Sequence, residues 1–266
     1  MTEGIGAPTA APAAGANHYV RSYWEREPCG TAHRVVGHAP VHGPEWFGAV
    51  ERTRYVEEPF VHSVAQFTRW RDKEVLEIGV GAGADHLQFA RAGARLHGVD
   101  LTEAAIATTR AHLALHGLAS DLRRLDAERL PLDDHSFDLV YSWGVIHHSE
   151  HPNRIVAEIH RVLRPGGTFR GMLYARRSVV AAKLWFRHAL VQGHPMRGLA
   201  DVVSSHMESP GTKAYTEREV RELFSGFQSC STRRIATLWD RARLPRAVAE
   251  LIPDSAGWFI AIDATS

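Results

Sequence analysis

The sequence from Val75 to Gly83 reads Val-Leu-Glu-Ile-Gly-Val-Gly-Ala-Gly, and it predicts more of the fold than any other stretch. The apolar run from Val75 to Ile78 is typical of a buried strand, and three glycines at alternate positions end it. Residues 84–90 then have the composition of a helix start, which completes the first half of a βαβ unit. Glycine allows a positive φ and lets a ligand approach the backbone closely. In an open parallel sheet this turn lies at the carboxyl end of a strand, where ligands bind.

The spacing of the glycines and the acid before them indicate the charge of the ligand. A dinucleotide fold prefers G-x-G-x-x-G, whereas this chain has G-x-G-x-G after Glu77. A carboxylate at Glu77 would repel a pyrophosphate and would attract an ammonium or a sulfonium group. From the loop alone, a glycine turn without any ligand remains the alternative.

Composition excludes several classes of partner. The 266 residues contain 31 Lys and Arg against 30 Asp and Glu, so we expect no nucleic-acid partner. No apolar run has the length of a membrane span, and the N-terminus has no signal-peptide pattern, so we expect no membrane association. The two cysteines, Cys29 and Cys230, form neither a disulfide framework nor a zinc motif. We therefore expect a reduced, cytoplasmic protein without a metal.

Strand and helix patterns alternate along the middle of the chain. We expect a disordered tail at 1–16, an N-terminal helical lid and packing region at 17–72, a ligand-binding core at 73–175, and cap helices with the last strands at 176–266. Alternation in the core predicts an α/β fold with a parallel sheet and helices on both faces. The expected core strands are 75–78, 95–99, 121–125, 136–142 and 168–174.

Five stretches in this order resemble the class I S-adenosylmethionine-dependent methyltransferases. They are the glycine loop, Asp100 after the second strand, Asp126 after the third, and the segments 130–140 and 161–167. The last two resemble the ubiquinone/menaquinone-biosynthesis-type branch, methyltransferase type 11. The resemblance covers about residues 73–175.

This resemblance implies a Rossmann-like, doubly wound sheet of seven strands, six parallel and the last antiparallel. It implies S-adenosyl-L-methionine as the cofactor, lying across the ends of the first and fourth strands. A carboxylate at Asp100 can accept both ribose hydroxyls, and Asp126 can accept the adenine amino group. The cofactor-binding residues that we predict are Glu77, Gly79, Gly81, Gly83, Asp100, Leu101, Asp126, Ala127 and Trp143.

The end of the fourth strand bears on the chemistry. Residues 142–148 read Ser-Trp-Gly-Val-Ile-His-His, where methylases of exocyclic or amide nitrogens resemble one another in an Asp/Asn-Pro-Pro-aromatic motif. The departure indicates a small-molecule acceptor. We expect His147 or His148 to be catalytic, as a contact to the cofactor or as a base. The alternative is that His147 packs under the adenosine and His148 orients a loop. A metal site at these histidines is not expected, because H-E-x-x-H is absent.

The acceptor pocket is expected from segments outside the core. Aromatic side chains at 19–24 suggest a lid helix, and the segment after the fifth strand commonly forms part of the substrate cap in this superfamily. The alternatives are that these aromatics only pack and that Glu208 and Lys213 form a surface pair. The substrate-binding residues that we predict are Tyr19, Tyr23, Tyr174, His206, Glu208 and Tyr215.

These patterns together predict methyl transfer by in-line displacement to a small, largely apolar or aromatic acceptor. The Ala-, Arg- and His-rich composition with few lysines suggests a high-GC bacterium, hence a role in natural-product biosynthesis. Oxygen, nitrogen and aromatic carbon all stay open as the methylated atom. A methyltransferase acting on a protein or peptide, and a cofactor-binding module without turnover, are the alternatives. Oligomeric state is not predicted by these patterns.

Overall fold

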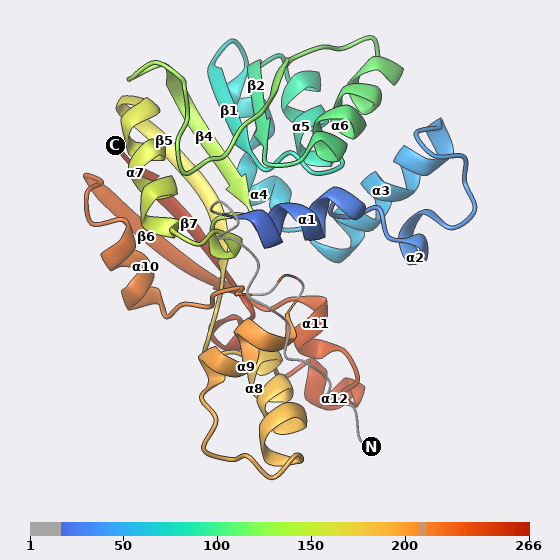
Figure 1. Ribbon diagram of the computed structural model, residues 1–266, viewed down its shortest axis with the longest axis vertical. Coiled ribbons are helices and arrows are strands. Elements are labelled where there is room, and N and C mark those ends of the chain that lie inside the picture. The colour runs from blue at the N-terminus through green and yellow to red at the C-terminus, as the bar shows by residue number, and fades with distance from the viewer. Residues whose placement is uncertain (1–16, 208, 210) are drawn as a thin grey trace, which may run out of the picture.

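The computed structural model describes residues 17–207, 209 and 211–266, and a single seven-stranded sheet runs through it (Figure 1). The tail expected at 1–16 lies outside the described residues. The strand order is β3-β2-β1-β4-β5-β7-β6. The strands are β1 (Glu74–Ile78), β2 (Arg95–Asp100), β3 (Asp121–Arg124), β4 (Phe137–Trp143), β5 (Leu163–Tyr174), β6 (Ser229–Ile235) and β7 (Phe259–Thr265).

Six strands are parallel, and β7 runs antiparallel between β5 and β6. The predicted Rossmann-like sheet with one antiparallel strand is therefore confirmed. The fifth strand, which was expected to begin at residue 168, begins at Leu163, so residues 164–167 belong to β5. The pairing register between β4 and β5 shifts there, between Phe137 and Leu139, which accommodates the extra residues.

Helices cover both faces of the sheet. One face carries α4 (Val61–Ala65) and α5 (Ala84–Arg91), with α6 (Glu103–Leu115) packed beside α5. The other face carries α7 (Pro152–Val162) and α10 (Glu217–Leu223). Side chains alternate along β1, so that neighbouring residues enter different cores. Leu76 and Ile78 pack toward α7, whereas Val75 packs with Phe89 of α5.

The N-terminal region consists of helices that lead to β1. They are α1 (His18–Arg26), α2 (His33–Val36), α3 (Pro44–Glu57), α4 and the 3₁₀ helix η1 (Phe67–Trp70). Pro44 occupies the first turn of α3, where a missing N–H costs nothing. The helix ends at Glu57, because Pro59 disfavours the helical conformation at Glu58. The four-residue α2 was not expected from the sequence.

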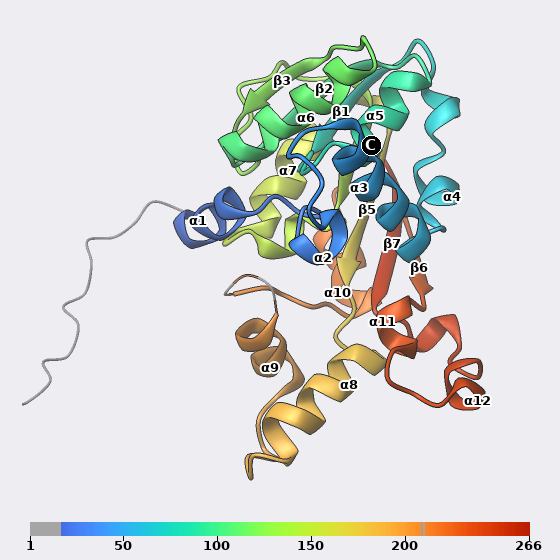
Figure 2. The same cartoon turned by 90° about the vertical axis from the view of Figure 1, so that its right-hand side faces the viewer.

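A helical cap lies beyond the carboxyl ends of β4 and β5 (Figure 2). No helix in residues 17–207, 209 and 211–266 combines the length and apolar character that crossing a membrane requires. Thr216 caps α10 in a full capping box with Glu219. The cap consists of α8 (Val179–Trp185), a π-helical turn (Phe186–Leu190), α9 (Leu199–His206), α11 (Leu238–Arg241), α12 (Arg246–Ala249) and the 3₁₀ turn η4 (Asp254–Ala256).

Candidate functional site

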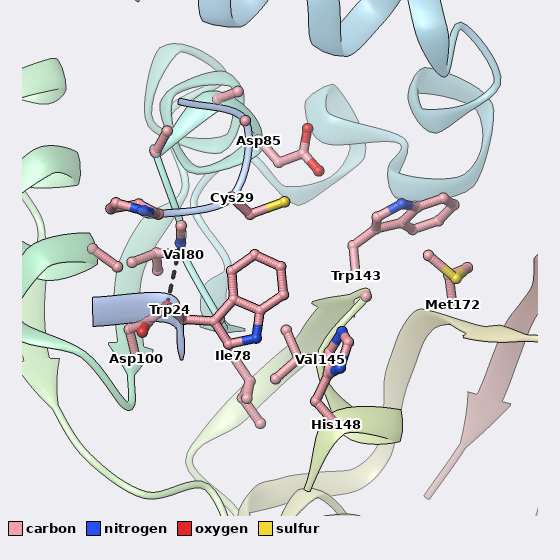
Figure 3. Close-up of a pocket in the computed structure, with 18 of the residues that line it drawn as sticks. Trp24, Cys29, Ile78, Val80, Asp85, Asp100, Trp143, Val145, His148 and Met172 are labelled. Carbon is pink, nitrogen blue, oxygen red and sulfur yellow. Dashed lines mark hydrogen bonds between the residues drawn. The ribbon is translucent and has the colours of Figure 1, made fainter. Parts of the chain in front are cut away.

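A cavity of about 500 Å³ lies at the carboxyl ends of β1, β2 and β4. Its volume falls in the range of small-molecule sites. Figure 3 shows the Trp24 indole of α1 reaching into the middle of it, with Asp85 and Cys29 on one side and Val145 and His148 on the other. The sheet, α1, α3 and the cap all contribute to its lining.

The glycine loop leaves no room for a side chain at its first position. Gly79 has φ +84°, and a Cβ there would lie 2.1 Å from Cγ2 of Val145. Gly83 has φ +77° as the N-cap of α5, where a Cβ would come within 3.0 Å of Thr109. Gly79 and Gly81 line the cavity, whereas Gly83 lies behind it. Backbone therefore forms this part of the lining, and a ligand can approach it closely.

Glu77 lines the cavity next to this loop and is 4% exposed. Its Oε2 lies 2.8 Å from Nδ1 of His86, whose Nε2 lies 2.7 Å from the Ser120 hydroxyl. Burial and the nearby Asp85 raise the pKa of the Glu77 carboxyl, and burial lowers the pKa of His86 to about 3. The neutral imidazole donates to Glu77 and accepts from Ser120. A cation in the cavity would favour the ionised form of Glu77.

Asp100, the predicted ribose-binding acid, lies at the end of β2 and in the cavity wall. Its Oδ1 accepts from the Thr102 amide at 2.9 Å and the Thr102 hydroxyl at 2.8 Å, and its Oδ2 accepts from the Gly81 amide at 3.3 Å. These bonds orient the carboxylate and join it to the glycine loop. Leu101 lines the cavity beside it.

Asp126 and Ala127 also line the cavity, and Asp126 binds a residue that sequence reasoning missed. The Asn17 amide nitrogen lies 3.1 and 3.3 Å from the two carboxylate oxygens of Asp126 and donates to Glu128 at 2.8 Å. The Asn17 carbonyl accepts from the Glu150 amide. Asn17 therefore fastens the start of α1 to the loops after β3 and β4. A carboxylate has further lone pairs, so Asp126 can accept an adenine amino group as well.

The face of α1 that lines the cavity is the one next to the predicted face. Val20 and Trp24 line the cavity, whereas Tyr19, which is 65% exposed, and Tyr23 do not. Positions 19 and 23 form one helical stripe, and positions 20 and 24 form the neighbouring stripe about 100° away. Glu25 holds the far end of the helix by accepting from the first amides of α6. The helix thus crosses the cavity, with Trp24 as its aromatic contact.

A buried charged cluster lies at the end of the cavity that faces α3. Arg54 donates to both carboxylate oxygens of Asp85, at 3.1 and 2.5 Å, and its third nitrogen lies 2.6 Å from Glu58. The hydroxyls of Tyr55 and Tyr141 donate to Asp85 at 3.1 and 2.8 Å. Despite burial, these partners lower the pKa of Asp85. One guanidinium thus serves two carboxylates, which leaves this end of the cavity negatively charged.

The wall next to this cluster is apolar and aromatic. Trp143 ends β4 and packs near Phe60 and Phe259, and its indole N–H donates to Glu58 at 2.7 Å. Tyr174 lines the same wall and stacks on Trp258. The other apolar residues of this wall are Met172, Val180, Leu184, Met207 and Trp239.

The two candidate catalytic histidines lie differently. His148 lines the cavity, and its Nδ1 lies 2.8 Å from the Ser209 hydroxyl and 3.0 Å from that of Thr212. His147 is fully buried outside the cavity lining, against the ring of Tyr174. Neither ring nitrogen of His147 has a hydrogen-bond partner among the described residues. Both residues belong to the 3₁₀ turn η2 (Ile146–His148), and their ring centroids lie 4.4 Å apart.

Burial of His148 makes folding sensitive to acid. Desolvation and the nearby Lys213 lower its pKa to about 3, against about 6.5 in the unfolded chain. The unfolded state therefore binds the proton first, and stability falls as the pH drops below about 6.5. When the pH is lowered from 7 to 5, protonation of this histidine in the unfolded chain should reduce the free energy of unfolding by about 2 kcal/mol. We expect urea titrations of His148→Asn to show a shallower pH slope than the parent, whereas exposed His194→Asn keeps the parent slope. Equal slopes in all three would contradict the assignment.

The remaining predicted acceptor contacts are not in the cavity wall. The His206 ring bonds the Val202 carbonyl and lies against His188. Tyr215 packs on the core beside α10, and its backbone bonds that of Tyr174. Glu208 lies outside the described residues. Of the predicted contacts, Tyr174 lines the cavity.

A possible metal-binding group lies behind the glycine loop, in the part of the chain that the structure describes. It comprises Glu51, His112 and His116. The Arg91 guanidinium donates to Glu51 at 2.8 Å and lies 3.2 Å from His116. His112 bonds the Ala82 carbonyl. Arg91 supplies positive charge here, and these contacts join α3, α5 and α6.

Comparison with known families agrees with this geometry. Residues 76–170 match the family model described as a methyltransferase domain. The phthiotriol/phenolphthiotriol dimycocerosates methyltransferase of Mycobacterium tuberculosis is 44% identical over 99 residues, which are 36% of this chain and 36% of that protein. The ubiquinone biosynthesis O-methyltransferase of Pseudomonas aeruginosa is 34% identical over 96 residues, 36% of this chain and 41% of that protein. The chain thus covers about two fifths or less of these relatives.

Solved structures share the fold over more of the chain. A Thermotoga maritima S-adenosylmethionine-dependent methyltransferase, titled a possible histamine N-methyltransferase, is 18% identical, with a TM-score of 0.54 over 82% of this chain and 95% of that one. The cyclase SpnF is 17% identical, with a TM-score of 0.55 over 93% of this chain and 91% of that one. Since a cyclase shares the fold, the reaction must be argued from the site.

Proposed function

Because residues 76–170 form a methyltransferase domain, we propose that this chain transfers a methyl group from S-adenosylmethionine to a small, largely apolar acceptor. The observation that carries the proposal is the division of one cavity into two parts. One part has the glycine loop, Glu77 and Asp100, and the other has the aromatic wall around Trp143. A cationic, hydroxyl-bearing cofactor suits the first part and an apolar acceptor suits the second.

The residues of the first part fit the cofactor in charge and shape. The backbone at Gly79 lines the cavity beside Glu77, whose carboxyl suits the methionine ammonium. The fixed carboxylate of Asp100 supports a role in accepting the ribose hydroxyls, and the presence of Asp126 and Ala127 in the cavity wall supports contacts with the adenine. S-Adenosylmethionine supplies a methyl group on a positively charged sulfur. The chain's own residues align the two reactants, and α1 excludes water above them.

The acceptor class follows from the second part of the cavity. Trp143, Tyr174, Trp258 and Phe259 present aromatic surface there, which favours a molecule with an apolar or aromatic body. One relative is named for phthiotriol dimycocerosates and the other for ubiquinone biosynthesis, and both names support an apolar acceptor here. We assign the protein to bacterial natural-product biosynthesis on this basis.

Calorimetric titration with S-adenosylmethionine and S-adenosylhomocysteine tests the cofactor assignment. We expect micromolar binding, weakened about 30-fold in Asp100→Ala, because charge-assisted hydrogen bonds are worth about 1.5–3 kcal/mol. Asp133→Ala, an exposed acid outside the cavity, should bind as the parent does. Failure of the parent chain to bind either compound would contradict the proposed function.

A further inference from the structure

Glu58 is a buried carboxylate with no part in cofactor binding as proposed. It follows the last residue of α3 and precedes Pro59, so the chain turns there and the side chain enters the cavity wall. The residue is 8% exposed. A carboxylate in an apolar wall is costly unless it is paired and hydrogen-bonded.

Its two oxygens have different surroundings. Oε2 accepts from the Arg54 guanidinium at 2.6 Å and from the Trp143 indole at 2.7 Å. No hydrogen bond joins Oε1 to any of the described residues, and Glu58 is part of the cavity lining. Trp143 and Arg54 therefore fix the carboxylate through one oxygen and leave the other available to a molecule in the cavity.

The charges around Glu58 favour proton uptake. Burial is the largest influence and raises the pKa of its carboxyl, Asp85 raises it further, and Arg54 and Trp143 oppose them. Arg54 divides its charge between Asp85 and Glu58. A carboxylate with a raised pKa is a stronger proton acceptor than an ordinary one at neutral pH.

The aromatic wall places Glu58 on the acceptor side of the cavity. Trp143, to which it is bonded, ends β4 and lies 6.1 Å, ring to ring, from Phe259. The histidines are less suited to the same task. His147 lies outside the cavity lining, and His148 directs Nδ1 to Ser209 and Thr212.

We propose that Glu58 accepts the proton of the acceptor's nucleophile, and hence that the acceptor is an apolar molecule with a hydroxyl or N–H group at its reacting end. The inference rests on the proposed function. As the acceptor oxygen or nitrogen forms its bond to the methyl carbon, the carbon–sulfur bond breaks and its electron pair stays on sulfur. The acceptor's proton passes to Oε1 of Glu58 and later to solvent, so charge and atoms balance.

Paired probes that differ by one proton test this inference. With S-adenosylhomocysteine at saturation, 2-naphthol is compared with 2-methoxynaphthalene, and indole with 1-methylindole. The parent chain should bind the protic member of at least one pair about tenfold more tightly, because only that member donates to the Glu58 carboxylate. Glu58→Gln, which cannot hold the charge, should reduce this preference to about twofold or less. Glu45→Gln, an exposed change on the preceding helix α3, should keep it.

The design separates the two proposals. If the parent chain does not bind S-adenosylhomocysteine, the result counts against the proposed function. If it binds S-adenosylhomocysteine but prefers the protic member of no pair, or binds no probe, the role of Glu58 is overturned. A preference that survives in Glu58→Gln overturns it too. If Glu58→Gln does not fold, the pH dependence of probe binding to the parent chain tests the inference. The preference for the protic member should decline as the pH is lowered, because Glu58 takes up a proton, while affinity for the methylated member stays constant. A preference independent of pH is the contrary result.

Discussion

A Gly79→Ala variant is expected to bind S-adenosylmethionine at least about 100-fold more weakly than the parent chain, a loss of about 2.7 kcal/mol. Alanine at φ +84° is strained by about 1–2 kcal/mol, and its Cβ would lie 2.1 Å from Val145. Overpacking of this kind typically costs a further 1–3 kcal/mol, so the loop must move. Since the loop backbone lines the cofactor part of the cavity, movement of the loop should reduce its complementarity to S-adenosylmethionine. Calorimetry measures the affinity, and urea titration measures the stability.

Gly193 provides the matched control for this variant. It has φ +77°, but a Cβ added there would meet no atom within 4 Å, and the residue does not line the cavity. Gly193→Ala should therefore cost about 1 kcal/mol of stability through backbone strain alone and leave cofactor affinity as it was. Affinity within threefold of the parent in Gly79→Ala would show that the contact with Val145 does not shape the site.

Replacement of Arg54 by methionine is expected to lower the free energy of unfolding by about 3–5 kcal/mol, because Asp85 and Glu58 would stay buried without their cation. The deficit should shrink as the pH is lowered. Without Arg54 the folded-state pKa values of both carboxyls rise, so the folded state binds more protons than the unfolded state and gains stability in acid.

Urea titrations at pH 7 and pH 5.5 measure both effects, with Arg246→Met as the control. The Arg246 side chain is 92% exposed and pairs with Glu250 on the surface, so its replacement should leave the unfolding midpoint unchanged. A small loss in Arg54→Met, comparable to that of the control, would mean that the buried cluster does not depend on its guanidinium.

The core could be predicted from sequence because its signals are local. Glycines at 79, 81 and 83 end a run of apolar residues, and acids at Asp100 and Asp126 follow two further strands. Strand order then brings these positions to one edge of the sheet. Each step needs only short-range pattern and the rule that parallel strands end at the same edge.

The acceptor part could not be predicted in the same way. Arg54 and Glu58 stand among charged residues at the end of α3, where charge usually indicates a solvent-exposed face. They are buried through contacts with Asp85 of α5 and with Trp143. In the lid helix, Tyr19 and Tyr23 were predicted to contact the acceptor, but Trp24 lines the cavity. The sequence could not separate them, because residues 18–24 have aromatic side chains on two adjacent stripes of the helix. Short helices such as α11 carry too few residues for a periodic signal.

The position of β7 has a consequence for biosynthesis. In the sheet, β6 pairs with β7 alone, and β7 is made later than every other strand. While the chain is being translated, β6 emerges before its partner and the outer edge of β5 stays open, so this side of the sheet is exposed to aggregation and chaperones. Trp258 and Phe259, which complete the aromatic wall, arrive with β7. The cofactor half can therefore form on the ribosome before the acceptor half is complete.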